Sequence, residues 1–273
     1  MSYNAILALL IALTMPILAR PPDVTFLCNE MPEICTNMCW AVRCAQPSFS
    51  QVLTLEPSSY GPGAQNESTT ISASCRINNL CGNLHGLNKT GHRDHPYSAC
   101  NAYPFSISTE GSPLPPAAIP STSQVSRCVP EEEQCEQRTQ LELLAQRLQK
   151  QQQQQQDGGQ QQGPRQLSIN FGNPGGIKYC NNDPCVNDGF EVQNSSIRRG
   201  SEAPLFKYYK TRSGIIIASL DDIDMLSAIT RRVGSGESIP DGSRTWFEQS
   251  REVRVHMVED AITQRLSAQP FVA

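Results

Sequence analysis

Hydrophobic and polar positions recur with different periods along the chain, and the period predicts the type of element. Ile34, Met38 and Val42 recur at helical spacing, which predicts a short helix within residues 23–45 after a β-rich start. Leu141, Leu144 and Leu148 recur in the same way among strong helix formers, which predicts an amphipathic helix from about Glu131 to Lys150. Three shorter runs read as strands: "QVLTLE", "QLSINF" and "DGFEVQ".

The last quarter of the chain has a different character, because no cysteine follows Cys185 and charged residues become denser. "LDDIDMLSAITRRV" has acidic residues at its start, Arg231 and Arg232 at its end, and apolar residues at helical spacing between them. "SRTWFEQSREVRVHMVEDAITQRLSAQ" places Trp246, Val253 and Met257 near one helical face. These patterns predict two helices joined by a linker, forming a helical extension over residues 196–273.

Low-complexity sequence separates the predicted central helix from the strand "QLSINF". A glutamine tract and "DGGQQQGPR" make up a Gln-rich insert at about residues 149–165. Such a composition favours a frayed helix end that runs into a flexible loop. A coiled-coil or aggregation role is the alternative.

The N-terminal apolar run from Ala5 to Leu18 is shorter than a comfortable membrane span. It predicts a secretory signal peptide over residues 1–19, with Ala19 as the last residue removed, and therefore a secreted, extracellular protein. A membrane-anchored form is the alternative, because the leader has no Lys or Arg; no stable membrane association is expected. Three sequons, at Asn66, Asn88 and Asn194, are typical of a secreted glycoprotein.

All eleven cysteines follow this leader, so disulfide bonds are expected. Zinc is the alternative, because "CTNMC" and "CNNDPC" have spacings that resemble those of ligands. The odd number leaves at least one thiol unpaired or bonded to another molecule. The net charge of −4 does not indicate a broad basic face for nucleic acid, so any phosphate contact must be local.

The stretch "GHRDHPYSAC" gathers His92, Asp94 and His95 within four positions. With Glu110, these residues could supply a general base, an orienting carboxylate and part of a metal site. A solvated surface loop is the alternative, because neighbours in sequence need not converge in space.

Several short blocks in a fixed order carry a family resemblance. "MPEICTNMCWAVRC", "HRDHPYSACNAYPFSISTEG", "SRCVPEEEQ", "QLSINF" and "DGFEVQ" resemble the secreted fungal branch of the NucA/NucB deoxyribonuclease family over roughly residues 23–195. The resemblance implies a small α+β endonuclease domain that hydrolyses DNA phosphodiesters with a divalent cation, Mg²⁺ or Mn²⁺. Carboxylates or a histidine normally hold the cation and activate water.

The family signature resembles Cys-Asp-Glu-Tyr-Pro-Phe followed by Glu-Gly-Gly. Cys100, Tyr103, Pro104, Phe105, Glu110 and Gly111 match it, whereas Asn101, Ala102 and Ser112 stand where the family has Asp, Glu and the second Gly. Asn can still offer an oxygen to a cation, but it has no charge and cannot act as a carboxylate base. The resemblance carries over Glu110 directly, and Asp94 with His92 or His95 could join it in a displaced site. The catalytic candidates are therefore Glu110, His92, Asp94 and His95, the candidate metal ligands are Asn101, Asp94 and Glu110, and Glu30 or Glu33 could approach this site.

The sequence thus predicts an α+β fold: a small disulfide-bonded nuclease-like domain over residues 23–195 with a helical C-terminal extension. The expected function is DNA hydrolysis that is weakened or lost. The alternative is a non-catalytic secreted binding or effector protein on the same scaffold. It would use an unknown protein partner through the Gln-rich insert or the C-terminal helices.

Overall fold

The computed structural model describes most of the chain after the predicted leader. The described residues are 23–55, 81, 96–111, 124–156, 165–188, 190–193, 198–199, 203–234, 236–239, 241–250, 253–267 and 270. The predicted signal peptide, the three sequons and the segment with His92, Asp94 and His95 lie outside these residues. Among the described helices, none is long and apolar enough to span a membrane.

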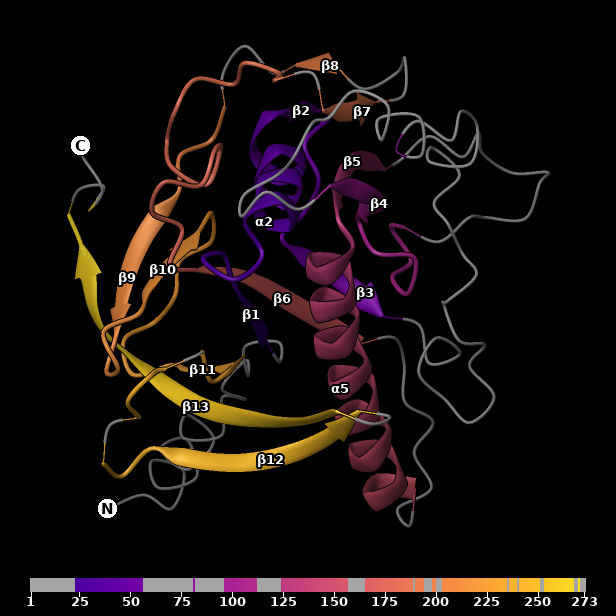
Figure 1. Ribbon diagram of the computed structural model, residues 1–273. Coiled ribbons are helices and arrows are strands. Elements are labelled where there is room, and N and C mark those ends of the chain that lie inside the picture. Colours follow the sequence, from indigo (N-terminus) through magenta and orange to yellow (C-terminus); the bar gives the residue numbers. More distant parts are fainter. Residues whose placement is uncertain are drawn as a thin grey trace, which may run out of the picture.

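Six strands form a closed barrel (Figure 1). Its strands are β1 (Asp23–Leu27), β6 (Arg165–Gly172), β9 (Lys207–Thr211), β10 (Ile216–Ser219), β11 (Ala228–Arg232) and β13 (Val253–Leu266). The hydrogen-bonded order is β1, β11, β13, β9, β10, β6, and the parallel pairing of β6 with β1 closes the ring. Strand β3 (Val52–Leu55) pairs with β6, and β12 (Arg244–Ser250) pairs with β13.

The prediction of an α+β fold with a helical C-terminal extension is wrong, because the structure is mostly β and residues 207–266 contribute five strands. Val253, Met257 and Ala261 are four residues apart, and this spacing lies on one face of a helix but also on one face of a strand. Pairing with β11 and β12 selects the strand. In the other segment, Leu226 adopts a positive φ of 67° and is 75% exposed, so no apolar stripe forms through it.

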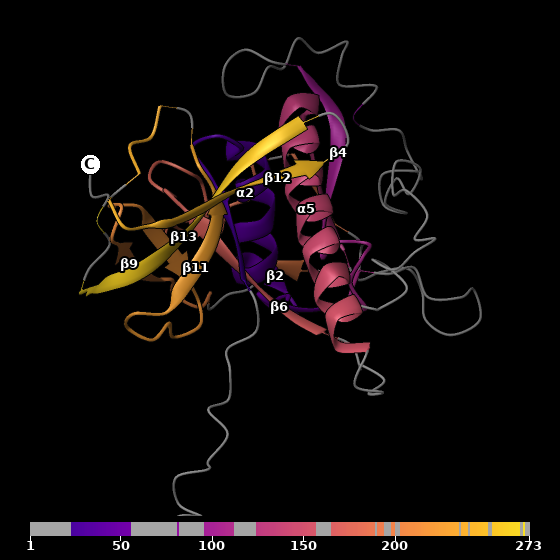
Figure 2. The same ribbon diagram turned by 90° about the horizontal axis from the view of Figure 1, so that it is seen from below.

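The chain between β1 and β6 forms a second layer beside the barrel (Figures 1 and 2). It contains α2 (Pro32–Cys39), a π-helical turn η1 (Trp40–Cys44), β2 (Ala45–Gln46), β3, β4 (Tyr97–Tyr103), β5 (Val125–Pro130) and α5 (Glu131–Gln156). Strands β4 and β5 form a small sheet with β7 (Glu191–Gln193), and β2 pairs with β8 (Arg198–Arg199). The predicted central helix is confirmed and continues through the glutamine tract to Gln156.

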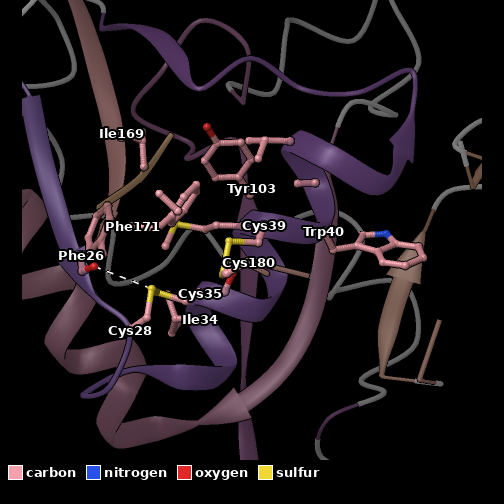
Figure 3. Close-up of a cluster of buried hydrophobic side chains, with 14 of the residues drawn as sticks. Phe26, Cys28, Ile34, Cys35, Cys39, Trp40, Tyr103, Ile169, Phe171 and Cys180 are labelled. Carbon is pink, nitrogen blue, oxygen red and sulfur yellow. Dashed lines mark hydrogen bonds between the residues drawn. A yellow bond between two sulfur atoms is a disulfide. The ribbon is translucent and has the colours of Figure 1, made fainter. Parts of the chain in front are cut away.

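The main core lies where α2 meets the barrel (Figure 3). Phe26 of β1 and Phe171 of β6 are fully buried there with Ile34 of α2. Tyr103 enters from β4, and its ring packs edge-on against Phe105 at 5.3 Å. Burial of aliphatic and aromatic groups of this size, at about 1.5–3 kcal/mol each, is the main force that joins the two layers.

Disulfide bonds fix α2 and η1 against the rest of the chain. Cys28 is bonded to Cys35, Cys81 to Cys128, and two further bonds join Cys39 to Cys180 and Cys44 to Cys185. Cysteines of both "CTNMC" and "CNNDPC" are therefore in disulfides, which favours bridges over zinc at these motifs. Cys100 is also disulfide-bonded, and Cys135 on α5 is a free, exposed thiol.

A buried ion-pair network holds one side of the barrel. The side chain of Arg231 is fully buried, and its guanidinium donates to Glu237, Asp260 and Ser213. The neighbouring Arg232 instead reaches out of the barrel to Glu30 and Glu136, at 2.5 and 2.6 Å. Arg231 therefore holds the C-terminal strands to one another, and Arg232 ties them to the layer that contains α2 and α5.

We expect Arg231→Met to lower the free energy of unfolding by about 3–5 kcal/mol, because it leaves two carboxylates without their buried cation. Urea unfolding followed by circular dichroism measures the change. The control is Arg244→Met, because the side chain of Arg244 is 81% exposed where it pairs with Glu259. This variant should lower the free energy of unfolding by less than about 1 kcal/mol. Equal losses from both variants would contradict a stabilising role for the buried network.

Candidate functional site

The candidate site lies where α2, β4, β5 and the first turns of α5 pack against one another (Figure 1). Asn101 of β4 and Arg127 of β5 are directly opposite each other in the antiparallel register, so their side chains share one face of the small sheet. That face is turned toward α2 and α5: α2 supplies a partner to both side chains, and α5 supplies a partner to Asn101.

Arg127 is the charged centre of the site, and it is only 3% exposed. Its Nε and Nη2 atoms donate to Glu33 Oε2 at 2.9 and 2.7 Å. On its other side, Nη1 and Nη2 donate to the two oxygens of Asp188 at 2.9 and 3.0 Å. One guanidinium therefore joins α2 to the segment after β6, and its charge is matched by two carboxylates.

Aromatic groups cover this ion pair. The Tyr97 hydroxyl donates to Glu33 Oε1 at 2.9 Å, and its ring stacks on Phe190 at 4.8 Å between centroids. The Arg127 guanidinium lies 5.2 Å from the centre of the same Phe190 ring. Burial, with the negative charge of Glu33 beside it, raises the pKa of Tyr97 above its ordinary value, so the phenol keeps its proton and acts as a donor.

Glu133 of α5 binds the N-terminus of α2. Its Oε2 atom accepts the backbone N–H groups of Glu33 and Ile34 at 2.8 and 3.1 Å. The preceding residue, Met31, provides no side-chain cap, so this contact takes the place of an N-cap. Burial raises the pKa of Glu133 to about 7, although the two backbone N–H groups act in the opposite direction.

Asn101 is 1% exposed and is held by amide groups alone. Its Oδ1 accepts from Asn37 Nδ2 at 2.8 Å, and its Nδ2 donates to Gln137 Oε1 at 2.6 Å. A third amide, that of Gln134, accepts from the same Nδ2 at 3.0 Å. All four side chains are neutral, so the position where the family has Asp is satisfied here without a charge.

Glu110 lies in a different environment from Asn101. Both of its carboxylate oxygens accept the backbone N–H of Thr54 on β3 at 3.0 Å. Burial, and to a lesser extent the negative charge of Glu110, raise the pKa of Tyr103. The Tyr103 hydroxyl donates to the backbone oxygen of Ser50. Gly111 follows in a tight turn where a Cβ atom would lie 2.1 Å from the Phe105 carbonyl oxygen, so only glycine fits.

Asn101 and Glu110 together do not fit a divalent cation. Their oxygens are turned to separate partners, Asn37 on α2 and Thr54 on β3, and the oxygen of Asn101 is enclosed by the amide network. Within the described part of the chain, no three His, Cys, Asp or Glu side chains gather as a metal centre would require. The third predicted ligand, Asp94, lies outside that part.

The remaining candidate residues also fall into two groups, those inside and those outside the described part of the chain. His92 and His95 lie outside the described residues, so their positions stay a prediction. Glu33 does approach the motif through Arg127 and Tyr97, whereas Glu30 pairs with Arg232 instead. Sequence reasoning missed Arg127, Asp188 and Glu133. The available signal was the block "SRCVPEEEQ", in which Arg127 and the acidic run that contains Glu133 lie on either side of Cys128.

The raised pKa of Glu133 makes a prediction about stability. Its proton is held more tightly in the folded protein, so its favourable contribution is present below about pH 4.5 and is lost as the pH rises through about 7. We expect Glu133→Gln to remove this loss while keeping an acceptor for α2. Between pH 5 and pH 8, the variant should gain up to about 3 kcal/mol of unfolding free energy relative to the unaltered protein.

Urea unfolding at a series of pH values measures this difference. Glu131→Gln is the matched control, because Glu131 is an exposed residue on the same helical turn. The interpretation fails if both variants keep the pH dependence of the unaltered protein.

Comparison with known proteins places part of this arrangement in a family. No curated protein and no solved structure gives a significant match. The family model described as deoxyribonuclease NucA/NucB matches residues 38–157, a little under half of the chain, which includes Asn101, Arg127 and Glu133. The resemblance to the NucA/NucB deoxyribonuclease family is therefore confirmed over residues 38–157, whereas the blocks "QLSINF" and "DGFEVQ" lie outside the matched residues.

Proposed function

We propose that this chain is a secreted NucA/NucB-type deoxyribonuclease-domain protein whose hydrolysis of DNA phosphodiesters is weakened or lost. The family match supports a nuclease domain and DNA as its substrate. The observation that carries the second half of the proposal is the enclosure of Asn101 by Asn37, Gln134 and Gln137.

Phosphodiester hydrolysis needs negative oxygens to hold a cation and a base to activate water. An amide can supply a neutral oxygen only, and the oxygen of Asn101 already accepts a hydrogen bond from Asn37. Ala102 has no polar group at all, and Glu110 is bound to the backbone of β3. A buried polar network in which every Asn101 group is satisfied favours a fixed structural arrangement over a reactive one.

The family match implies that hydrolysis would depend on a divalent cation, with Mg²⁺ or Mn²⁺ as the candidates. Asp94, His92 and His95 could still supply a displaced site together with Glu110, and they are part of the proposal to be tested. The disulfides among the described residues support export to an oxidising compartment, where the sequons would be glycosylated.

Digestion of plasmid DNA in Mg²⁺ or Mn²⁺ tests this proposal. We expect little or no cleavage by the unaltered protein and at least about 10²-fold faster cleavage by Asn101→Asp/Ala102→Glu, since a positioned carboxylate base contributes on that order. The amides of Gln134 and Gln137 can rotate to donate to the new carboxylate, so the double variant should fold. Asn101→Asp/Ala102→Gln, which lacks the second carboxylate, is the control.

Two further variants separate a displaced site from a lost one. If the unaltered protein cleaves and Glu110→Gln and His92→Ala each abolish cleavage, hydrolysis proceeds through the displaced site, and weakening by Asn101 is not the explanation. If no variant cleaves DNA while thermal unfolding shows an intact fold, the nuclease proposal is wrong. The alternative of a non-catalytic binding protein is then favoured by the neutral network around Asn101.

A further inference from the structure

Strand β12 and the first half of β13 form a two-stranded ribbon that extends beyond the barrel. Seven residue pairs join the strands, from Arg244 opposite Glu259 to Ser250 opposite Val253. In both views the ribbon reaches across α5 (Figures 1 and 2). It lies entirely outside the residues matched by the family.

One face of the ribbon is attached to α5. Val255 and Met257 of β13 are buried against Leu143 of α5, and Trp246 packs on the same cluster. The Arg147 guanidinium lies 5.0 Å from the centre of the Trp246 ring. This face is therefore part of the core and holds the ribbon in place.

The opposite face carries a row of planar groups, which we call the outer stack: Arg254, Phe247 and His256. The Phe247 and His256 rings are 4.3 Å apart and within 20° of parallel. The Arg254 guanidinium lies 4.2 Å from the centre of the Phe247 ring. Because Phe247 and His256 are direct cross-strand neighbours, the ribbon itself sets this alignment.

A stack that served only to stabilise the pairing of the two strands would not need to be exposed, yet the outer stack faces water. Phe247 is 55% exposed, and Arg254 is exposed as well. Arg254 forms no ion pair with a carboxylate in the described part of the chain, in contrast to Arg244 and Arg265, which pair with Glu259 and Asp222. The stack thus combines an exposed ring with a cation that is not neutralised by a described acidic group.

We propose that the outer stack is a binding surface for single-stranded DNA. Unpaired bases stack on aromatic rings and on guanidinium planes, while the arginine charge neutralises the adjacent phosphate. This mode needs no broad basic face, which agrees with a net charge of −4. The exposed ring and the cation point to stacking of unpaired bases without reference to the proposed function, whereas the choice of DNA as the polymer rests on that function.

Helix α5 connects this surface to the candidate site. Gln137 near its start binds Asn101, and Arg147 ten residues later lies beside Trp246 of the ribbon. At 1.5 Å per residue, these two positions are about 15 Å apart along the helix. The attachment of the ribbon to α5 therefore lies about 15 Å along the helix from the candidate site, and the outer stack is on the face of the ribbon opposite to this attachment.

Fluorescence anisotropy of a labelled oligothymidylate of about 16 nucleotides tests the surface. The full chain is titrated in EDTA, so that binding is measured without hydrolysis. We expect Phe247→Leu and Phe247→Ala to weaken binding about tenfold, Phe247→Tyr to retain it, and Arg254→Gln to weaken it and reduce its salt dependence. Arg265→Gln, on the same strand but outside the stack, should leave binding within about twofold.

Three results would overturn the proposal: no binding by the unaltered protein, equal binding by folded Phe247→Leu, or equal losses from Arg265→Gln and Arg254→Gln. Equally tight binding of a duplex of the same sequence would also overturn it, because paired bases cannot stack on the ring. Thermal unfolding checks that each variant is folded. If the protein does not cleave DNA, the binding measurement still tests the outer stack. If binding fails while cleavage is intact, the proposal for the ribbon surface is wrong and the proposed function is not affected.

Discussion

The position of helix α2 is the constraint on which the candidate site depends. Its N-terminus is held by the carboxylate of Glu133, and its C-terminal end is fixed to the loop after β6 by the Cys39–Cys180 bond. From this helix, Glu33 reaches Arg127 and Asn37 reaches Asn101. If α2 shifted by one turn, both contacts would be lost together, because they lie four residues apart on one face.

Local sequence patterns predicted the elements whose period is unambiguous. The leucines of α5 at positions i, i+3 and i+7 lie together only in a helix, and the apolar runs of β3 and β6 are short and bounded by turn residues. The C-terminal strands were missed because spacings of four suit both a helix and a strand. Two of them, β11 and β10, pair with β1 and β6, which are far away in sequence, and no local pattern contains that information.

The candidate site was only partly predictable for a related reason. The motif identified Asn101 as an altered position, but the meaning of the change comes from Gln134 and Gln137, which looked like ordinary polar residues of a helix. Arg127 similarly acquires its role only when α2 and the segment after β6 bring Glu33 and Asp188 to it. Sequence shows which chemistry is missing, whereas the fold shows what has replaced it.

The two disulfides with a sequence separation of 141 also affect how the protein responds to proteases. All six barrel strands lie outside residues 38–157, so the family-type segment is an insertion between β1 and β6. Cys39–Cys180 and Cys44–Cys185 join the start of that segment to the loop after β6. A single peptide cleavage anywhere between Cys44 and Cys180 would therefore give two chains that remain one covalent molecule, with the barrel still joined to the segment that it surrounds in sequence.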